Sequence, residues 1–153
     1  MKLYLVQHGE ARSKADDPQR PLTERGREDV ARVAVFAANT GCQVRQIRHS
    51  DKRRAEETAS ILAEHLSPAE GMVAIPGLAP KDDVRSTAAT LQNETRPVML
   101  VGHLPFLEHL ASLLVTGDPD RSIVRFQMGG IVCLVREEKS WTVGWMVTPD
   151  LIP

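Results

Sequence analysis

The sequence predicts a three-layer α/β fold in which helices cover both faces of a mainly parallel sheet. Apolar runs of strand length alternate four times with longer segments of helical periodicity, and this alternation is typical of parallel strands joined by crossover helices. The last part of the chain instead has two strand-like runs around the polar letters EEKS. That pattern predicts an antiparallel hairpin at the edge of the sheet.

The first strand and the first helix have clear boundary signals. KLYLVQ, residues 2–7, is a continuous apolar run and predicts a buried strand. After a polar loop, residues 22–39 place apolar side chains at helical spacing. Thr23 is the expected N-cap of this helix and Gly41 its stop signal.

The second strand and helix repeat the pattern. Residues 43–50, QVRQIRHS, predict a strand, and residues 51–66 predict a helix that begins at Ser50 or Asp51. Much of the apolar face of this helix is supplied by Ala59, Ile61, Leu62 and Leu66.

Two further strand and helix pairs complete the alternation. Residues 72–75 predict a short strand and residues 82–93 a helix. A buried strand over residues 97–103 is followed by a helix over residues 105–117. The hairpin then covers residues 129–149.

Composition limits the classes of function. The chain has 153 residues, 42% of them hydrophobic, and its charges nearly cancel to −1, so we expect one domain without the basic field of a nucleic-acid or membrane-surface binder. Cys42 and Cys133 lack metal-ligand spacing, which favours thiols over a zinc site or a disulfide. The apolar run at the N-terminus is too short for a signal peptide or a membrane span, which favours a cytoplasmic protein.

The ends of the predicted parallel strands gather the polar residues. Ligands of such sheets bind beyond the carboxyl ends of the strands. The residues at those ends are Gln7, His8, Gly9, His49, Ser50, Gly102 and His103. Lys52, Arg53 and Arg54 open the following helix, whose free N–H groups and dipole also favour anions. Histidines, cations and a helix N-terminus together predict a phosphate site.

Four motifs in this order carry a family resemblance: LVQHGEA, LTERGREDV, HSDKRRAEETA and LVGHLP. They resemble the histidine phosphatase superfamily, which has the phosphoglycerate-mutase-like fold, and the shortness of the chain resembles its SixA-type phosphohistidine phosphatase branch. The resemblance spans nearly the whole chain and implies a single histidine-phosphatase-like domain over residues 1–153.

The resemblance also implies roles for three residues. His8 matches the nucleophile, and Arg54 and His103 match the groups that grip the phosphoryl group. An imidazole can hold the phosphoryl group as a phosphoramidate, and fixed donors can meet its charge. The remainder of the predicted phosphate pocket is Gln7, Gly9, Arg12, Ser50 and Gly102. Ser50 could equally serve only as an N-cap, and no metal or cofactor is required.

Gln7 departs from the family pattern, which usually has arginine before the nucleophile. Its amide donates hydrogen bonds but carries no charge, so phosphate binding should weaken unless another cation compensates. The candidates in the nearby loops are Arg12, Lys14, Lys52 and Arg53. Gln7 is consistent with a working phosphatase or with a protein that binds phosphorylated ligands without turnover. We favour the phosphatase, because the nucleophile and both residues that bind the phosphoryl group are present.

A second departure concerns the leaving group. Larger members of the superfamily carry an insertion with a glutamate that protonates the leaving alcohol, whereas residues 76–96 here are short. A phosphorylated histidine leaves readily once protonated and does not need that acid. Asp82, Asp83 and Glu10 are alternative proton donors, although acidic residues at such places are more often solvated caps.

The sequence therefore predicts a phosphatase with a phospho-His8 intermediate and a phosphohistidine protein, such as a histidine-phosphotransfer domain, as its substrate. The alternatives are a small-molecule phosphomonoesterase acting on a phosphorylated metabolite and a noncatalytic phosphate-binding module. We expect no nucleic-acid or membrane partner. The remaining histidines are interpreted as structural: His49, His65 and His109. Trp141 and Trp145 are interpreted as core and hairpin packing.

Overall fold

The computed structural model describes residues 1–153 and contains one six-stranded sheet, with strand order β3-β2-β4-β1-β5-β6. The strands are β1 (Lys2–Gln7), β2 (Gln46–His49), β3 (Met72–Ala74), β4 (Val98–Gly102), β5 (Ile131–Glu137) and β6 (Ser140–Val147). The first four pair in parallel, and β5 joins β1 in antiparallel orientation. The hairpin of β5 and β6 forms one edge, which confirms the predicted fold class.

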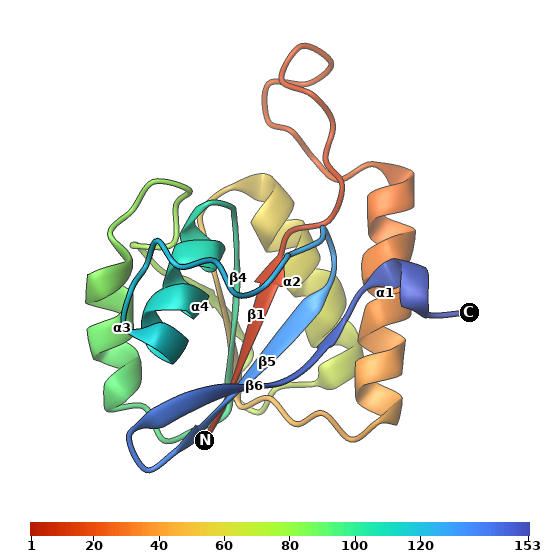
Figure 1. The fold of residues 1–153 in the computed structure, drawn as a ribbon. Helices are drawn as coiled ribbons and strands as arrows, with labels where there is room; N and C mark the ends of the chain where they lie inside the picture. The colour runs from red at the N-terminus through yellow and green to blue at the C-terminus, as the bar shows by residue number, and fades with distance from the viewer.

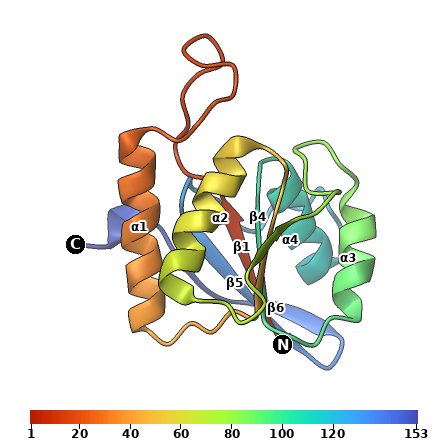
Figure 2. The same cartoon turned by 180° about the vertical axis from the view of Figure 1, so that it is seen from behind.

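Helices cover both faces of this sheet (Figures 1 and 2). The helices are α1 (Glu24–Asn39), α2 (Arg53–Leu66), α3 (Val84–Gln92) and α4 (Phe106–Thr116), and a 3-10 turn, η1, follows at Pro149–Leu151. The helices α1 and α2 pack on one face and α3 and α4 on the other. None of them combines the length and the apolar character that crossing a membrane requires.

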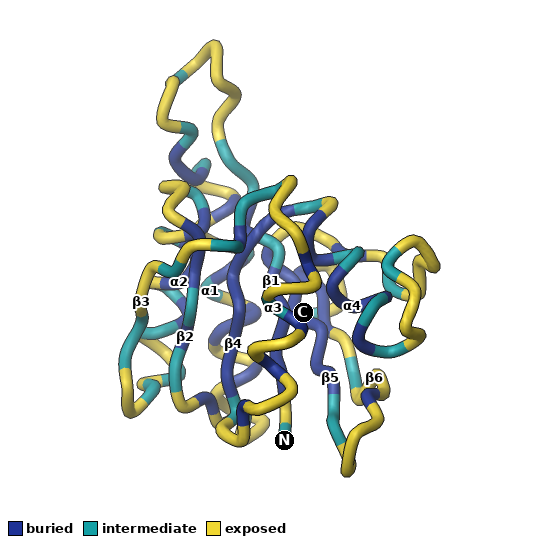
Figure 3. Tube along the Cα trace, turned by 90° about the vertical axis from the view of Figure 1, so that its left-hand side faces the viewer, coloured by how far each residue is buried: buried dark blue, intermediate teal, exposed yellow.

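Alternation along β1 divides its side chains between two cores. Leu3 and Leu5 are fully buried in the core under α3 and α4, and Tyr4 and Val6 join the core under α1 and α2. Burial on both faces explains why β1 and β4 read as continuous apolar runs (Figure 3). Apolar burial of this kind is the main force that holds the layers together.

The predicted caps are confirmed at α1 and corrected at α2. Thr23 caps α1 by accepting a hydrogen bond from the Gly26 N–H at 2.9 Å, and Gly41 follows the helix with φ of 79°. The prediction that α2 begins at Ser50 or Asp51 is wrong, because the helix starts at Arg53 after Lys52, which makes no side-chain cap. Ser50 instead has a partner in the site described below.

The segment between β1 and α1 stands out from the body of the molecule and is mostly exposed (Figures 1 and 3). Backbone contacts close its base: Ala11 pairs with Leu22, and the Arg12 N–H donates to the Pro21 carbonyl at 2.8 Å. The Glu57 carboxylate of α2 accepts from the Leu22 N–H at 2.7 Å. These bonds fix the base of the segment beside the N-terminus of α2.

Candidate active site

Sheet register brings His8 and His103 together. Gln7 pairs with Gly102 where the parallel strands β1 and β4 end, and the His8 N–H donates to the Gly102 carbonyl at 3.0 Å. His8 and His103 directly follow the last residues of these two strands, and their ring centroids lie 5.1 Å apart. Both are buried, with exposed fractions of 9% and 2%.

The His8 ring is held with one nitrogen free for chemistry. Its Nδ1 lies 2.7 Å from the Gly9 carbonyl oxygen, an acceptor, so Nδ1 carries the proton and donates it. The lone pair is therefore on Nε2, where the Arg54 Nε–H donates at 3.3 Å. Burial lowers the His8 pKa to about 4, although the Gly9 carbonyl opposes the shift. His8 is thus neutral at physiological pH.

Gly9 and Thr58 join β1 to α2. The Gly9 N–H donates to Thr58 Oγ1 at 3.0 Å, and that hydroxyl donates to the Arg54 carbonyl at 2.7 Å. A Cβ at Gly9 would lie 2.8 Å from Val30 Cγ2 on α1, so only glycine fits this approach. Sequence reasoning missed Thr58, whose signal was a hydroxyl four residues after Arg54 on a helix face that is otherwise apolar.

Ser50 is the partner of His103 rather than the cap of α2. Its Oγ lies 2.6 Å from His103 Nε2 and accepts a longer bond from the Lys52 N–H at 3.3 Å. Burial lowers the His103 pKa to about 3, and repulsion from His8 in its protonated form and from the Arg54 guanidinium adds to the shift. His103 Nδ1 is buried without a hydrogen-bond partner.

The cation that sequence reasoning missed is Arg20. Its field contributes to lowering the pKa of His8, Arg54 and His103, although burial is the largest cause for each. Arg20 has φ of 49°, which is uncommon for a residue other than glycine, and its Nε donates to the Arg12 carbonyl at 3.1 Å. It is half-buried at the closed base of the protruding segment. The available signal was its position just before Pro21 and the first turn of α1.

Cations surround a polar hollow of about 460 Å³ between this segment and α2. Its charged lining residues are Lys14, Arg20, Asp51, Lys52, Arg53 and Arg54. The side-chain hydrogen bonds of Arg54 and Arg20 go to His8 and to a backbone carbonyl, whereas Arg53 pairs with Glu57 at 3.3 Å. Arg54 and Arg20 therefore keep positive charge available for an anion.

Neither Gln7 nor Arg12 lines the cationic hollow beside Arg54. Gln7 lines a separate polar hollow of about 500 Å³ with Glu10 and Gln127, and its Oε1 is buried without a partner. Arg12 is exposed, and its backbone bonds to Pro21 and Arg20. The roles of both residues in phosphate binding stay predictions, as does that of Gly102, whose carbonyl accepts from His8.

The acidic candidates all have local partners. Asp83 caps α3 by accepting from the Arg85 N–H at 3.0 Å, and Asp82 accepts from the Ala79 N–H at 2.8 Å. Glu10 accepts from the Thr23 hydroxyl at 2.8 Å. These bonds favour the interpretation of the three carboxylates as caps. No group of three or more His, Cys, Asp or Glu side chains is arranged to hold a metal ion.

The remaining histidines lie apart from this arrangement. His49 is buried, and its Nδ1 lies 2.8 Å from the Ser50 carbonyl oxygen. His65 and His109 lie on α2 and α4, and His109 Nδ1 is 2.7 Å from the Pro119 carbonyl oxygen. Their surroundings agree with structural or surface positions.

The chain is similar to known proteins in both sequence and fold. A family model described as "Histidine phosphatase superfamily (branch 1)" matches residues 3–79. An uncharacterized protein of Picosynechococcus sp. is 33% identical over 142 residues, which make up 88% of this chain and 84% of the relative.

Solved structures share the fold over nearly the whole chain. The protein histidine phosphatase SixA, complexed with tungstate, is 25% identical with a TM-score of 0.88 and 99% coverage of both chains. SixA of Agrobacterium tumefaciens is 22% identical with a TM-score of 0.79 and 97% coverage of both chains. A mycobacterial glucosyl-3-phosphoglycerate phosphatase is 17% identical with a TM-score of 0.71, covering 94% of this chain and 97% of its own.

Proposed function

Because this chain belongs to the histidine phosphatase superfamily, we propose that it hydrolyses phosphohistidine in a protein substrate through a covalent intermediate on His8. Phosphatase activity as such is supported by the family and by the likeness to SixA. The observation that carries the proposal is the neutral His8 ring, whose free Nε2 faces Arg54 beside His103.

In the first step, His8 Nε2 attacks phosphorus as the bond to the substrate nitrogen breaks. The phosphohistidine of the substrate reacts with its second ring nitrogen protonated, so its imidazole leaves as a neutral ring that keeps this proton. The phosphoryl group becomes a phosphoramidate on His8 Nε2. The Gly9 carbonyl holds the Nδ1 proton and stabilises the positive charge that develops on the His8 ring. In the second step, water attacks phosphorus, His8 leaves, and inorganic phosphate is released.

Arg54 and Arg20 supply the positive charge that the phosphoryl oxygens require, and neutral His103 supplies an N–H donor. Arg54 can present a forked pair of donors, and His103 can donate from Nε2 once the phosphoryl group displaces its contact with Ser50. Arg20 offers the full charge that Gln7 lacks, and we therefore assign it the compensating role. Ser50, Gly9 and Thr58 position these groups.

The short region between β3 and α3 favours phosphohistidine as the substrate. Glu10, Asp82 and Asp83 all make local hydrogen bonds, which argues against each of them as the acid that protonates a leaving alcohol. The likeness to a protein histidine phosphatase at 25% identity supports the same substrate class. The small-molecule alternative is supported by the shared fold of a glucosyl-3-phosphoglycerate phosphatase. The cytoplasmic location remains a prediction.

The test is release of phosphate from a ³²P-histidine-phosphorylated phosphotransfer domain, with sugar phosphates and p-nitrophenyl phosphate in parallel. His8→Ala is compared with His65→Ala, which removes an exposed histidine on α2. We expect turnover of the protein substrate, an acid-labile label on the chain, and loss of both in His8→Ala alone. Loss of turnover should be at least about a thousandfold.

Two results would contradict the proposal. Faster hydrolysis of small phosphomonoesters than of the protein substrate would establish the alternative phosphatase. Binding of the phosphorylated domain with no turnover and no label would identify a noncatalytic module.

A further inference from the structure

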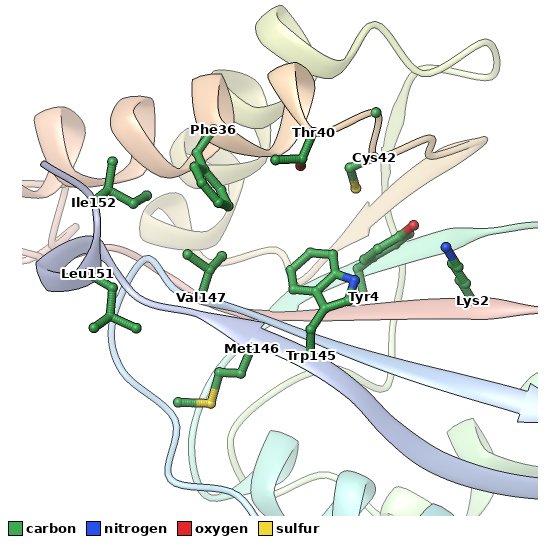
Figure 4. A pocket seen from close by; sticks show the side chains of 11 residues that line it. Lys2, Tyr4, Phe36, Thr40, Cys42, Trp145, Met146, Val147, Leu151 and Ile152 are labelled. Atoms are coloured by element: carbon green, nitrogen blue, oxygen red, sulfur yellow. The ribbon is translucent and has the colours of Figure 1, made fainter.

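A third hollow, distinct from the two polar ones described above, lies toward the start of β1, away from His8. It is about 450 Å³ in volume and opens between the C-terminal end of α1, β6 and η1 (Figure 4). Lys2 and Tyr4, near the start of β1, form one of its ends, whereas His8 follows the last residue of that strand. The catalytic arrangement therefore contributes no residue to this pocket.

Most of the side chains that line it are apolar. Phe36 on α1 faces Val147 and Trp145 on β6, and Leu151 and Ile152 close the far end (Figure 4). Phe36 is 40% exposed and Leu151 68% exposed, so this concave surface leaves large apolar groups in water. Apolar surface gathered in a hollow is typical of a binding site.

A β-bulge turns Trp145 into this pocket. Trp141 and Trp145 are four residues apart, so a regular strand would place both on one face of the sheet. The register of β6 shifts between the pairs Leu134–Val143 and Cys133–Trp145, which leaves Gly144 without a partner. Trp141 consequently packs under α3 and α4, whereas Trp145 packs 5.9 Å from Tyr4.

The polar groups gather at one end. Lys2 is the only charged side chain in the lining, and it is exposed (Figure 4). Burial raises the pKa of Tyr4 and of Cys42, so both remain neutral at physiological pH. The Lys2 ammonium makes no ion pair within the chain and lies close enough for its field to reach Cys42. The pocket thus presents an apolar trough with a single cation at its end.

We propose that this pocket binds a small amphiphilic carboxylate of medium chain length, with its apolar tail between Phe36, Trp145 and Val147 and its carboxylate at Lys2. The pocket volume lies within the range of roughly 300–1,000 Å³ that is typical of small-molecule sites. One cation in the lining matches one anionic head, and the elongated apolar trough matches an alkyl tail. This site is independent of the proposed phosphatase reaction.

The proposal is tested by isothermal titration calorimetry of the full chain with octanoate, in the presence of saturating inorganic phosphate. Saturating phosphate is added to fill the proposed phosphate site at His8, and a second titration without phosphate shows whether the two ligands compete. We expect saturable binding with Kd of about 1 mM or tighter. Octan-1-ol, which lacks the charge, should bind about tenfold more weakly.

Two variants of residues that line the pocket, one at its polar end and one at its apolar side, are each compared with a control variant outside it. Lys2→Gln should weaken octanoate binding about tenfold and leave octanol binding unchanged, whereas Lys139→Gln, in the turn of the hairpin, should change neither. Phe36→Ser should weaken both ligands, and Val35→Ser, at a comparably exposed neighbour on α1, should weaken neither.

The proposal is overturned by any of three results: no saturable heat with octanoate, equal affinity in Lys2→Gln and Lys139→Gln, or competition between octanoate and phosphate. The proposal would also be overturned if the chain self-associates, if Phe36→Ser abolishes this self-association and if octanoate does not. The trough would then be an interface between two copies. None of these results bears on turnover at His8.

Discussion

Arginines occur in two contrasting surroundings in this molecule. At the amino end of β4, Glu94 lies between Arg48 and Arg96, with N–O distances of 2.7 and 2.9 Å, and the side chains of Arg48 and Glu94 are 12% and 8% exposed. At the carboxyl end of the same strand, Arg54 donates to the neutral His8 ring and has no carboxylate partner.

This difference in partners distinguishes charged residues that stabilise the fold from charged residues that are available to bind a ligand. Arg96 and then Arg48 hold the pKa of Glu94 well below its usual range, so each charged group in that cluster lies against a group of opposite charge. Around His8, burial and neighbouring cations instead lower the pKa of both histidines. A partly buried cation without a counterion is costly in the empty site and becomes favourable when an anion binds.

Exchanging one arginine in each cluster for methionine gives the largest expected contrast. Arg54→Met should lower kcat/KM by about a hundredfold to a thousandfold, because it removes the main donor to the phosphoryl oxygens, with little loss of thermal stability. Arg48→Met should leave kcat/KM nearly unchanged and lower Tm by several degrees, because it leaves Glu94 with one partner fewer. Steady-state kinetics and thermal unfolding of both variants measure this. An equal loss of activity in Arg54→Met and Arg48→Met would contradict the distinction between the two arginine clusters.

Arg20→Met tests whether the protruding segment supplies the compensating charge. We expect about a tenfold loss of affinity for phosphate or vanadate, because one charge-assisted contact is lost. Arg12→Met is the matched control, since it is in the same segment but exposed. Calorimetric titration of both variants measures the effect. If Arg12→Met caused the larger loss, the compensating role would pass to Arg12.

Gln7→Arg should have a smaller effect, raising phosphate affinity or turnover by a few-fold if the site is weakened by the missing cation. Inhibition by phosphate and kcat/KM with the phosphorylated domain measure it. If the natural chain is already highly active and Gln7→Arg raises neither phosphate affinity nor turnover, Arg20 already supplies the missing positive charge. In that outcome, the double variant Arg20→Met with Gln7→Arg should recover part of the loss.

The two clusters should also respond to acid at different pH. His8 and His103 have folded pKa values of about 4 and about 3 against an ordinary value of 6.5, so between pH 6.5 and about 4 the unfolded chain binds protons that the folded chain does not. The free energy of unfolding should therefore fall as pH is lowered from 6.5. The depressed pKa of Glu94 adds its own loss only below its ordinary value of 4.5.

His103→Asn isolates the histidine contribution. Its free energy of unfolding should fall less steeply than that of the natural chain between pH 6.5 and 4.5, as measured by urea denaturation. An unchanged slope would show that His103 is not kept neutral by its surroundings.

The sequence alone determined the order of the elements and the position of three of the central residues. Each strand and helix can be recognised from the local spacing of its apolar residues. The spacing reflects the backbone geometry, which decides which side chains of a strand or helix face the core. His8 and His103 could be placed because they directly follow buried parallel strands, whose carboxyl ends meet at one edge. Arg54 was singled out by its motif, since three neighbouring cations have equal claims from spacing.

Only the tertiary structure decided which side chains meet across the site. Serine is a common N-cap residue, but the pairing of β2 with β4 brings the Ser50 hydroxyl to His103. Arg20 comes to line the same hollow as Arg54 because the base of a long segment closes, and helix packing brings Thr58 to Gly9, the residue after the nucleophile. The bulge at Gly144 sends two tryptophans to opposite faces. These contacts depend on register and on residues distant in the chain, whereas a local pattern reports only the conformation and burial of its own segment.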